Sequence, residues 1–340
     1  MVDSSYRFQP HEPTQQAVQR IASGCLAAAL SELTFENEQK REHAVHEARK
    51  RLKETRAILA LVRRALGKHT YRRENSQLRK AARELTKARE AAARVGCFDM
   101  LLERFADQVA GQSFQSIRSR ILEERDRAID EVSQSAELAE AKTALSAAQE
   151  RLASLELSRQ GWRAISPGLR RGYARARRAM QQAYARPTPE RFHQWRKGAK
   201  RHYYHLELLD VLPAGEAASQ RRKELKLLSE WLGDDHDLAE LDRYLARNES
   251  ELDAIAVALL RTLAQNRSNE LRARAGDLGR RLFAEKPKAF RRSLRGELEP
   301  ELTAAPGVQK ARAKTRRGVN KVAANGGQAA AEPARRRQAR

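Results

Sequence analysis

Basic side chains and a histidine share one predicted helical face in the segment RFHQWRKGAKRHYYHLEL, residues 191–208. His193, Arg196 and Lys200 are spaced three and then four residues apart, and Lys197 and Arg201 lie beside them. Residues at these spacings meet on one side of a helix, so the segment predicts a stack of like charges that repel one another. Three interpretations fit this stack: a solvated surface, a nucleic-acid contact or a bed for another polyanion.

A second segment, AVHEARKRLKETRAILALVRRALG at 44–67, repeats this pattern. A shift of 147 residues superposes four pairs: His46 on His193, Arg49 on Arg196, Lys50 on Lys197 and Lys53 on Lys200. The same ungapped shift superposes further pairs downstream: Leu78 on Leu225, Leu85 on Leu232, and Arg89–Glu90 on His236–Asp237. One unbroken offset over about fifty residues predicts a tandem duplication of a helical unit.

Each predicted motif helix separates into a packing face and a cationic face. In the first helix the packing residues are Val45, Leu52, Ile58, Leu59 and Val62, and the cationic stripe is His46, Arg49, Lys53, Arg56 and Arg63. In the second, Trp195, Leu206 and Leu209 are core candidates. A solvated surface explains the exposure of both stripes. It does not explain why the same histidine and cations recur with few acids between them.

The composition predicts an all-α protein. Hydrophobic residues make up 41% of the chain but aromatics only 5%, and long runs of Ala, Leu, Glu, Arg and Lys lack the alternation of strands. We expect two tandem four-helix-type bundles related by a pseudo-twofold duplication. The predicted boundaries are 12–160 for the first repeat, 161–285 for the second, 286–305 for a linker and 306–340 for a disordered basic tail.

The predicted helices follow from the apolar periodicity and the helix-breaking residues. In the first repeat they cover 12–34, 39–66, 73–94 and 98–109, with a helical hairpin over 113–158. In the second they cover 169–185, the segment opened by Pro187 and Pro189 and closed by Pro213, 215–232, 235–247, 250–264 and 267–284.

The formal net charge is +23, and a field of that sign attracts polyanions. Residues 161–205 hold 12 Lys and Arg against one acid, Glu190, so the excess belongs to the folded part as well as to the tail. The tail has almost no large apolar side chains and is interpreted either as a solubilising extension or as a non-specific polyanion arm.

Two cysteines, Cys25 and Cys97, suit a reducing cytosol and form no disulfide framework. The apolar run IASGCLAAAL is too short to span a membrane and follows no basic n-region. We therefore expect a cytoplasmic protein without a signal peptide.

The two basic segments resemble the signature of the CHAD family, the conserved histidine α-helical domain. Its pattern is a histidine, an arginine three residues on, and basic residues seven, eight and ten residues on. The first copy presents His46, Arg49, Lys53, Glu54 and Arg56, and the second presents His193, Arg196, Lys200, Arg201 and Tyr203. Glu54 and Tyr203 depart from the pattern and are doubtful ligand contacts.

Two further segments extend the resemblance, which covers about residues 12–285. LRRGYARARRAM is similar to the family's Tyr- and Arg-rich helix, with Arg170, Arg171, Tyr173, Arg175, Arg177 and Arg178. WLGDDHDLAEL is similar to its leucine–glycine–aspartate turn, at Leu232, Gly233, Asp234 and Asp237. The corresponding LTKARE of the first copy has lost most of that pattern.

The resemblance implies paired helical bundles around a basic groove or pore that binds inorganic polyphosphate, and an association with polyphosphate granules. The physics agrees, because a linear polyphosphate needs cations along a track and no stacking aromatics. We expect contacts from Arg49, Lys53, Arg56, Arg196, Lys197, Lys200 and Arg201. A second tier contains Arg170, Arg171, Arg175 and Arg178, and the wider predicted site adds His46, Lys50, Arg63 and His193.

The two motif histidines have two interpretations. Each is either a buried neutral residue that hydrogen-bonds between helices or a donor to phosphate whose contact strengthens as pH falls through its pKa.

Three other functional classes remain as alternatives. Asp234, Asp235, His236 and Asp237 suggest a phosphohydrolase metal site, but such a site needs ligands from other helices, and aspartates at a helix start are commoner as caps. We find neither the glutamate–lysine strands of a tunnel-type triphosphatase nor a P-loop, and we expect no enzyme activity, cofactor or metal. Non-specific nucleic-acid binding fits the charge but not the low aromatic content. Binding to a membrane surface through a basic amphipathic helix fits less well, because the cations belong to a compact bundle.

Overall fold

The computed structural model describes residues 6–10, 12–35, 37, 40–106, 114–210 and 216–303. Within these ranges the regular structure is helical and contains no strand, which confirms the all-α prediction. The first helices are α1 (Thr14–Glu32), α2 (Arg41–Leu61), α3 (Arg63–Leu66), α4 (Lys68–Glu84), α5 (Thr86–Arg104), α6 (Gln115–Ser133) and α7 (Ala136–Ala153). They are followed by α8 (Gly161–Ala185), α9 (Pro189–Leu208), α10 (Glu216–Arg247), α11 (Ala254–Leu282) and α12 (Pro287–Thr303), with a short 3₁₀ turn at Glu249–Glu251.

Helix starts in this chain follow ordinary capping chemistry. Thr188 caps α9, where its hydroxyl accepts from the Arg191 amide at 3.4 Å, and Pro189 occupies the first turn. Ser135 caps α7 and Asp253 caps α11 in the same way. Gly67, with φ of +87°, separates α3 from α4 in a conformation that favours glycine.

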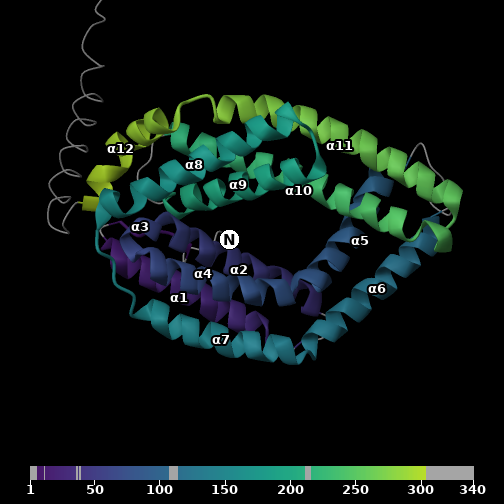
Figure 1. Ribbon diagram of the computed structural model, residues 1–340, viewed down its shortest axis with the longest axis horizontal. Helices are drawn as coiled ribbons and strands as arrows, with labels where there is room; N and C mark the ends of the chain where they lie inside the picture. Colours follow the sequence, from purple (N-terminus) through teal and green to yellow (C-terminus); the bar gives the residue numbers. More distant parts are fainter. Residues whose placement is uncertain are drawn as a thin grey trace, which may run out of the picture. The chain divides into compact units, whose positions relative to one another are not determined.

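The two predicted repeats share one compact body, to which the described residues up to Leu302 belong. Helices α1, α2, α4 and α7 pack together, as do α8, α9, α10 and α11 (Figure 1). One hydrophobic cluster joins residues of both repeats, for example Leu52 and Trp195, and a second joins α5 and α6 with α10 and α11. The internal duplication is compatible with this arrangement and stays a prediction.

Several predicted boundaries differ from the structure. α4 ends at Glu84 and α5 begins at Thr86, where one helix was predicted over 73–94, and α8 begins at Gly161 instead of at 169. α10 runs unbroken through Gly233 and Asp234, so the expected turn at this sequence is wrong. One glycine costs a helix only about 1 kcal/mol, and Leu232, Leu238 and Leu241 keep a buried helical stripe across it. α11 likewise continues through the gap expected at 265–266, where no glycine or proline interrupts it.

The segment predicted as a linker, 286–305, contains helix α12. Phe290, Leu294 and Leu298 are buried, and their spacing of four residues places them on one face. This apolar stripe packs against the main cluster, where Phe290 stacks on Tyr173 with ring centroids 4.1 Å apart. The predicted tail, 306–340, lies outside the described residues. In the described part of the chain, no helix is both long and apolar enough to cross a bilayer.

Candidate functional site

A cavity of about 390 Å³ lies between α2, α5, α9 and α10. Around it, α2 contacts α5 and α9, and α10 contacts the same two helices, so the four helices form a closed ring of contacts. Nine basic and three acidic side chains line the cavity. This excess of cations makes it the candidate functional site.

The first motif helix supplies one wall. Arg49, Lys53 and Arg56 of α2 line the cavity at spacings of four and three residues, as their shared helical face predicts. Arg49 is held by the Thr86 hydroxyl at 3.0 Å and by the Ala82 carbonyl, and Arg56 donates to the Asn75 side chain at 3.1 Å. These neutral acceptors position the cations without cancelling their charge.

The second motif helix supplies the facing wall. His193, Arg196, Lys197, Lys200 and Arg201 of α9 all line the same cavity. Helix α9 is fixed to α2 through a buried contact, in which His205 Nε2 lies 3.1 Å from the carbonyl oxygen of Ala57. The predicted core residues Trp195, Leu206 and Leu209 are buried on the other side of α9. The structure therefore brings together the cationic stripes of both sequence copies.

Sequence reasoning missed the residues of the other two walls. Helix α5 contributes Arg89, Glu90 and Arg94, and α10 contributes His236, Asp237 and Glu240. A signal for part of this set was present, because the shift that superposes the motifs also superposes Arg89–Glu90 on His236–Asp237. Both members of each pair line the cavity.

The cations of the cavity are poorly neutralised. Arg94 pairs with Glu124 at 2.9 Å, whereas none of the other eight forms an ion pair with a carboxylate in the described part of the chain. The Nε atoms of Arg49 and Arg196 are buried and have no hydrogen-bond partner there. These two nitrogens are therefore donors whose hydrogen-bonding capacity is not used within the cavity.

The pKa values in the cavity record the same imbalance. Burial and the charges of Arg196, Arg49 and Arg89 lower the pKa of Lys53 to about 7. Burial and Arg201 lower the pKa of Arg56 to about 10. Burial raises the pKa of Asp237, while Arg196, Arg89 and Lys53 lower it, so this carboxylate is a counter-charge to these three cations.

The two motif histidines have different environments, and a contact of either with phosphate stays a prediction. The His193 ring lies tilted against the His236 ring, with centroids 3.9 Å apart, and its buried Nδ1 has no hydrogen-bond partner in the described residues. Burial, with Lys197 and Arg196, lowers the pKa of His193 to about 4, so its ring is neutral at pH 7. Neither motif histidine is fully buried, whereas His202 and His205 are.

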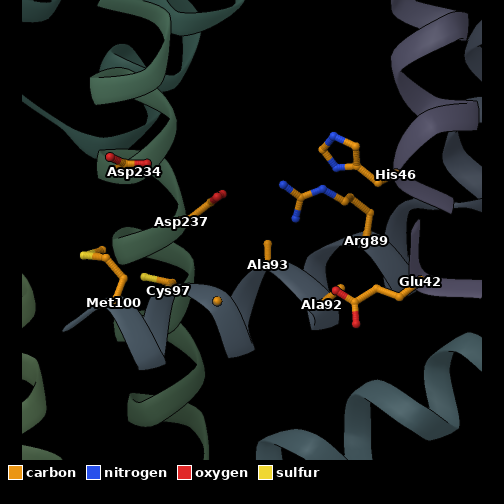
Figure 2. Close-up of a pocket in the computed structure, with 10 residues that line it drawn as sticks. Glu42, His46, Arg89, Ala92, Ala93, Cys97, Met100, Asp234 and Asp237 are labelled. Carbon is orange, nitrogen blue, oxygen red and sulfur yellow. The ribbon is translucent and has the colours of Figure 1, made fainter. Parts of the chain in front are cut away.

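His46 lies in a hollow that adjoins the cavity and shares Arg89, Ala93 and Asp237 with it. Figure 2 shows Arg89 of α5 between His46 and Asp237, with Asp237 pointing from α10 toward the arginine. Burial and Arg89 lower the pKa of His46. Its place beside the cavity, not within it, separates it from its counterpart His193.

Six other predicted residues lie outside the cavity. Lys50 turns to Glu47, with a distance of 2.9 Å between the charged atoms, and Arg63 lies over the Tyr71 ring. Arg170, Arg171, Arg175 and Arg178 are exposed and surround separate hollows along α8. These four share a helix with the buried Tyr173, and none of them lines the cavity.

The two positions that depart from the family pattern lie apart from the cavity lining, which agrees with the doubt about them as contacts. Glu54 is buried, pairs with Arg51 at 3.2 Å and has a pKa raised by burial to about 7. Tyr203 donates its hydroxyl to Glu207 at 2.8 Å.

The acidic run considered for a metal site is divided between different roles. Asp235 pairs with Arg272 at 2.7 Å and accepts from the Ser268 hydroxyl at 2.5 Å. Asp237 lines the cavity, and Asp234 lines the adjoining hollow with it. In the ranges that the structure describes, no group of three His, Cys, Asp or Glu side chains has the geometry to hold a metal ion.

Comparison with known proteins agrees with this architecture. A family model described as the CHAD domain matches residues 21–246. The fold is similar to that of the CHAD domain from the plant Ricinus communis, with a TM-score of 0.60 and 18% identity over 83% of this chain and 95% of the other. It is also similar to PptA from Streptomyces chartreusis, with a TM-score of 0.57 and 16% identity over 81% and 100%. No curated protein matches the sequence.

Proposed function

The chain belongs to the CHAD domain family, and on that premise we propose that its cation-lined cavity binds inorganic polyphosphate. The observation that carries the proposal is the convergence of Arg49 and Arg196, from two sequence-related helices, on one cavity. Each brings a buried Nε without an acceptor, and a phosphate oxygen is the acceptor that suits a guanidinium best.

The chemistry of the walls favours polyphosphate over a nucleic acid. Recognition of single-stranded nucleic acid uses aromatic platforms on which bases stack. Of the described Phe, Tyr and Trp residues, Tyr204 alone lines the cavity. It is 6% exposed, and its ring centroid lies 5.1 Å from the Lys200 ammonium. A ligand that offers only anionic oxygens matches such walls, because nine of the side chains that line them are cations and three are acids.

We propose a binding role without catalysis. His193 and His236 also line the cavity, and burial and the neighbouring cations lower the pKa of both, so neither ring is an imidazolium at pH 7 that could act as a general acid. Asp237 is surrounded by Arg196, Arg89 and Lys53 and serves as their counter-charge. The expected result is that incubated polyphosphate keeps its chain length.

A titration tests the proposal directly. Long-chain polyphosphate, duplex DNA and tRNA are compared at two salt concentrations, because electrostatic contacts weaken with salt in proportion to their number. Polyphosphate is expected to bind more tightly than either nucleic acid at both. Equal affinity for nucleic acid under all conditions would contradict the proposed specificity.

Reversing four cavity charges should abolish polyphosphate binding. The variant carries Arg49→Glu, Lys53→Glu, Arg196→Glu and Lys200→Glu, and its helical circular dichroism spectrum shows whether the fold is retained. A second variant that ends at Pro306 keeps the cavity and lacks the basic tail. Loss of binding in the shortened variant alone would assign the ligand to the tail.

Association with polyphosphate granules follows from the same proposal. A fluorescent fusion of the full chain is expected to gather at granules in cells that accumulate polyphosphate, and the fusion with four reversed charges is expected to spread evenly. Granule association that survives the charge reversal would show that another part of the chain is responsible.

A further inference from the structure

Outside the cavity, basic side chains of α3, α4 and α8 surround three hollows that share Arg171. We call this set the α8 strip, and its members are Arg64, Lys68, Arg170, Arg171, Arg175 and Arg178. Arg63 lies beside it, over the Tyr71 ring. Among the residues that the structure describes, no acidic side chain lines any of the three hollows.

The strip differs in neutralisation from other surface cations of this chain. Exposed arginines elsewhere find partners, such as Arg118 with Asp99 at 2.8 Å and Arg104 with Glu270 at 2.7 Å. Within the described ranges, no member of the strip forms an ion pair. The sequence explains this, because residues 157–189 contain no acid at all. Burial and the neighbouring Arg63 and Arg64 lower the pKa of Arg171, as expected for cations without counter-charges.

The strip forms a row. Arg171, Arg175 and Arg178 follow spacings of four and three residues on α8, so they lie on one helical face over a rise of about 10 Å. Gln182 extends this face by one turn and lines the same hollow as Arg175 and Arg178. At the other end, Arg171 shares hollows with Arg64 and Lys68.

Two features place the strip next to the cavity. Gln194 of α9 lines a hollow of the strip, and the next turns of the same helix face carry Lys197 and Arg201, which line the cavity. The charge of Arg175 lowers the pKa of both these residues, so it lies close to them.

Tyr71 of α4 is the second junction. Burial lowers the pKa of Arg56 and Arg201 in the cavity and of Arg171 in the strip, and the Tyr71 phenol opposes that lowering for all three. Arg63 stacks over the same ring, 4.7 Å from its centroid. One aromatic side chain therefore lies within electrostatic reach of both cationic surfaces.

We propose that the α8 strip is a second track for the polyanion, continuous with the cavity, so that one long polyphosphate chain occupies both. This inference rests on the proposed function, because it assigns the same ligand to a second surface. A chain that fills the cavity meets Lys197 and Arg201 at its edge, then Arg175, and then the row toward Arg171 and Arg64.

The second track makes affinity depend on chain length. Tripolyphosphate fits within the cavity and has no phosphates left to reach the strip. A long chain gains further arginine contacts, and each phosphate that is neutralised adds to the salt dependence of binding. The strip therefore makes the protein prefer long polyphosphate over short polyphosphate, whereas the cavity binds both.

Neutralisation of the strip tests the inference in the full-length protein. The strip variant carries Arg171→Gln, Arg175→Gln and Arg178→Gln. The matched control carries Arg127→Gln, Lys223→Gln and Arg281→Gln, which remove the same charge from exposed positions outside the cavity and the hollows. Affinities for tripolyphosphate and long-chain polyphosphate are measured for both variants over a range of salt concentrations.

The expected result is selective. The strip variant should lose at least about tenfold in affinity for the long chain and show a shallower salt slope, with a much smaller loss for tripolyphosphate. The control should lose little for either ligand. Equal losses in the strip variant and the control would overturn the inference, because net charge would then explain the effect. So would a strip variant that loses affinity for single-stranded RNA and keeps it for polyphosphate.

The cavity variant distinguishes this failure from failure of the proposed function. If reversal of Arg49, Lys53, Arg196 and Lys200 leaves tripolyphosphate binding intact, the cavity is not the site and the proposed function is wrong. If that reversal abolishes tripolyphosphate binding while the strip variant binds both ligands as the native chain does, the proposed function stands and the second track is wrong.

Discussion

Arg49 and Arg196, which superpose under the 147-residue shift, line the same cavity, and the charge of Arg196 lowers the pKa of Arg49. The two guanidinium groups come from helices whose packing is fixed by buried contacts such as that of His205 with Ala57. The free protein therefore holds like charges together at an electrostatic cost. An anionic ligand relieves that cost, so binding and stability oppose each other in this cavity.

Replacing Lys53 with methionine should stabilise the free protein and weaken polyphosphate binding. Lys53 is partly buried among Arg49, Arg89, Arg196 and Lys200, and a buried charge exchanged for an apolar side chain of similar volume is often stabilising. We expect a gain on the order of 1 kcal/mol in the free energy of unfolding, measured in denaturant. Lys50→Met is the control, because Lys50 pairs with Glu47 at the surface and should change stability by less than about 0.5 kcal/mol. A Lys53→Met protein that is less stable than the native chain would contradict this account.

Polyphosphate affinity should fall as pH rises above about 7. The free protein releases the Lys53 proton through that pH, whereas bound anion raises the Lys53 pKa toward its ordinary value and requires the proton back. The groups around the ammonium are Arg49, Arg89, Arg196 and Lys200, with Asp237 opposing them.

The loss should approach about tenfold per pH unit for one coupled proton and vanish below pH 7. Titration calorimetry at pH 8 in two buffers of different ionisation enthalpy should report proton uptake. Lys53→Met should make polyphosphate affinity less dependent on pH, and the size of that reduction measures how much of the pH dependence comes from Lys53. Proton release at pH 8 would refute the prediction.

The sequence predicted the facing stripes because they depend on local spacing. Arg49, Lys53 and Arg56 share one helical face. Any packing that buries Leu52 and Ile58 therefore orients all three cations together. The repeat then predicted that α9 would present the same face. The walls from α5 and α10 were missed because Arg89 and His236 differ in residue type although they coincide in position.

The continuity of α10 and the presence of α12 could not be predicted from local signals. Gly233 is a local signal for a turn. The burial of Leu232 and Leu238 in the folded core outweighs the free-energy cost of a glycine inside a helix. The sequence around Phe290 was predicted to be a linker, because the stacking of Phe290 on Tyr173 exists only in the folded chain. In both cases a tertiary contact decides the local structure.

Glu54 should make the protein less stable as pH rises. Burial raises its pKa from 4.5 to about 7, so between these values the folded chain holds a proton that the unfolded chain releases. The resulting loss in the free energy of unfolding is absent below about pH 4.5 and complete above about pH 7, where it reaches about 3 kcal/mol.

Glu54→Gln should remove this loss, giving a more stable protein at pH 8 and an unchanged one at pH 4. Glu47→Gln is the control of opposite sign, because Lys50 helps to lower the Glu47 pKa and its loss should cost stability at pH 8. Denaturant unfolding at the two pH values measures both.

Gly168 should tolerate no side chain, because α8 and α2 meet there backbone to backbone. A Cβ at this position would lie 1.9 Å from the carbonyl oxygen of Leu61, and neither helix can yield without moving a buried neighbour such as Leu169. Gly168→Ala should therefore lower the free energy of unfolding by about 3 kcal/mol or more and lower the melting temperature.

Gly24→Ala is the matched control. Gly24 lies inside α1 with nothing within 4 Å of its Cβ position, so alanine should stabilise the protein by about 0.5–1 kcal/mol. The same contact holds the α8 strip beside the cavity, so any Gly168→Ala protein that folds should lose its preference for long polyphosphate over tripolyphosphate. A Gly168→Ala chain as stable as the native one would show that the helices do not meet in this way.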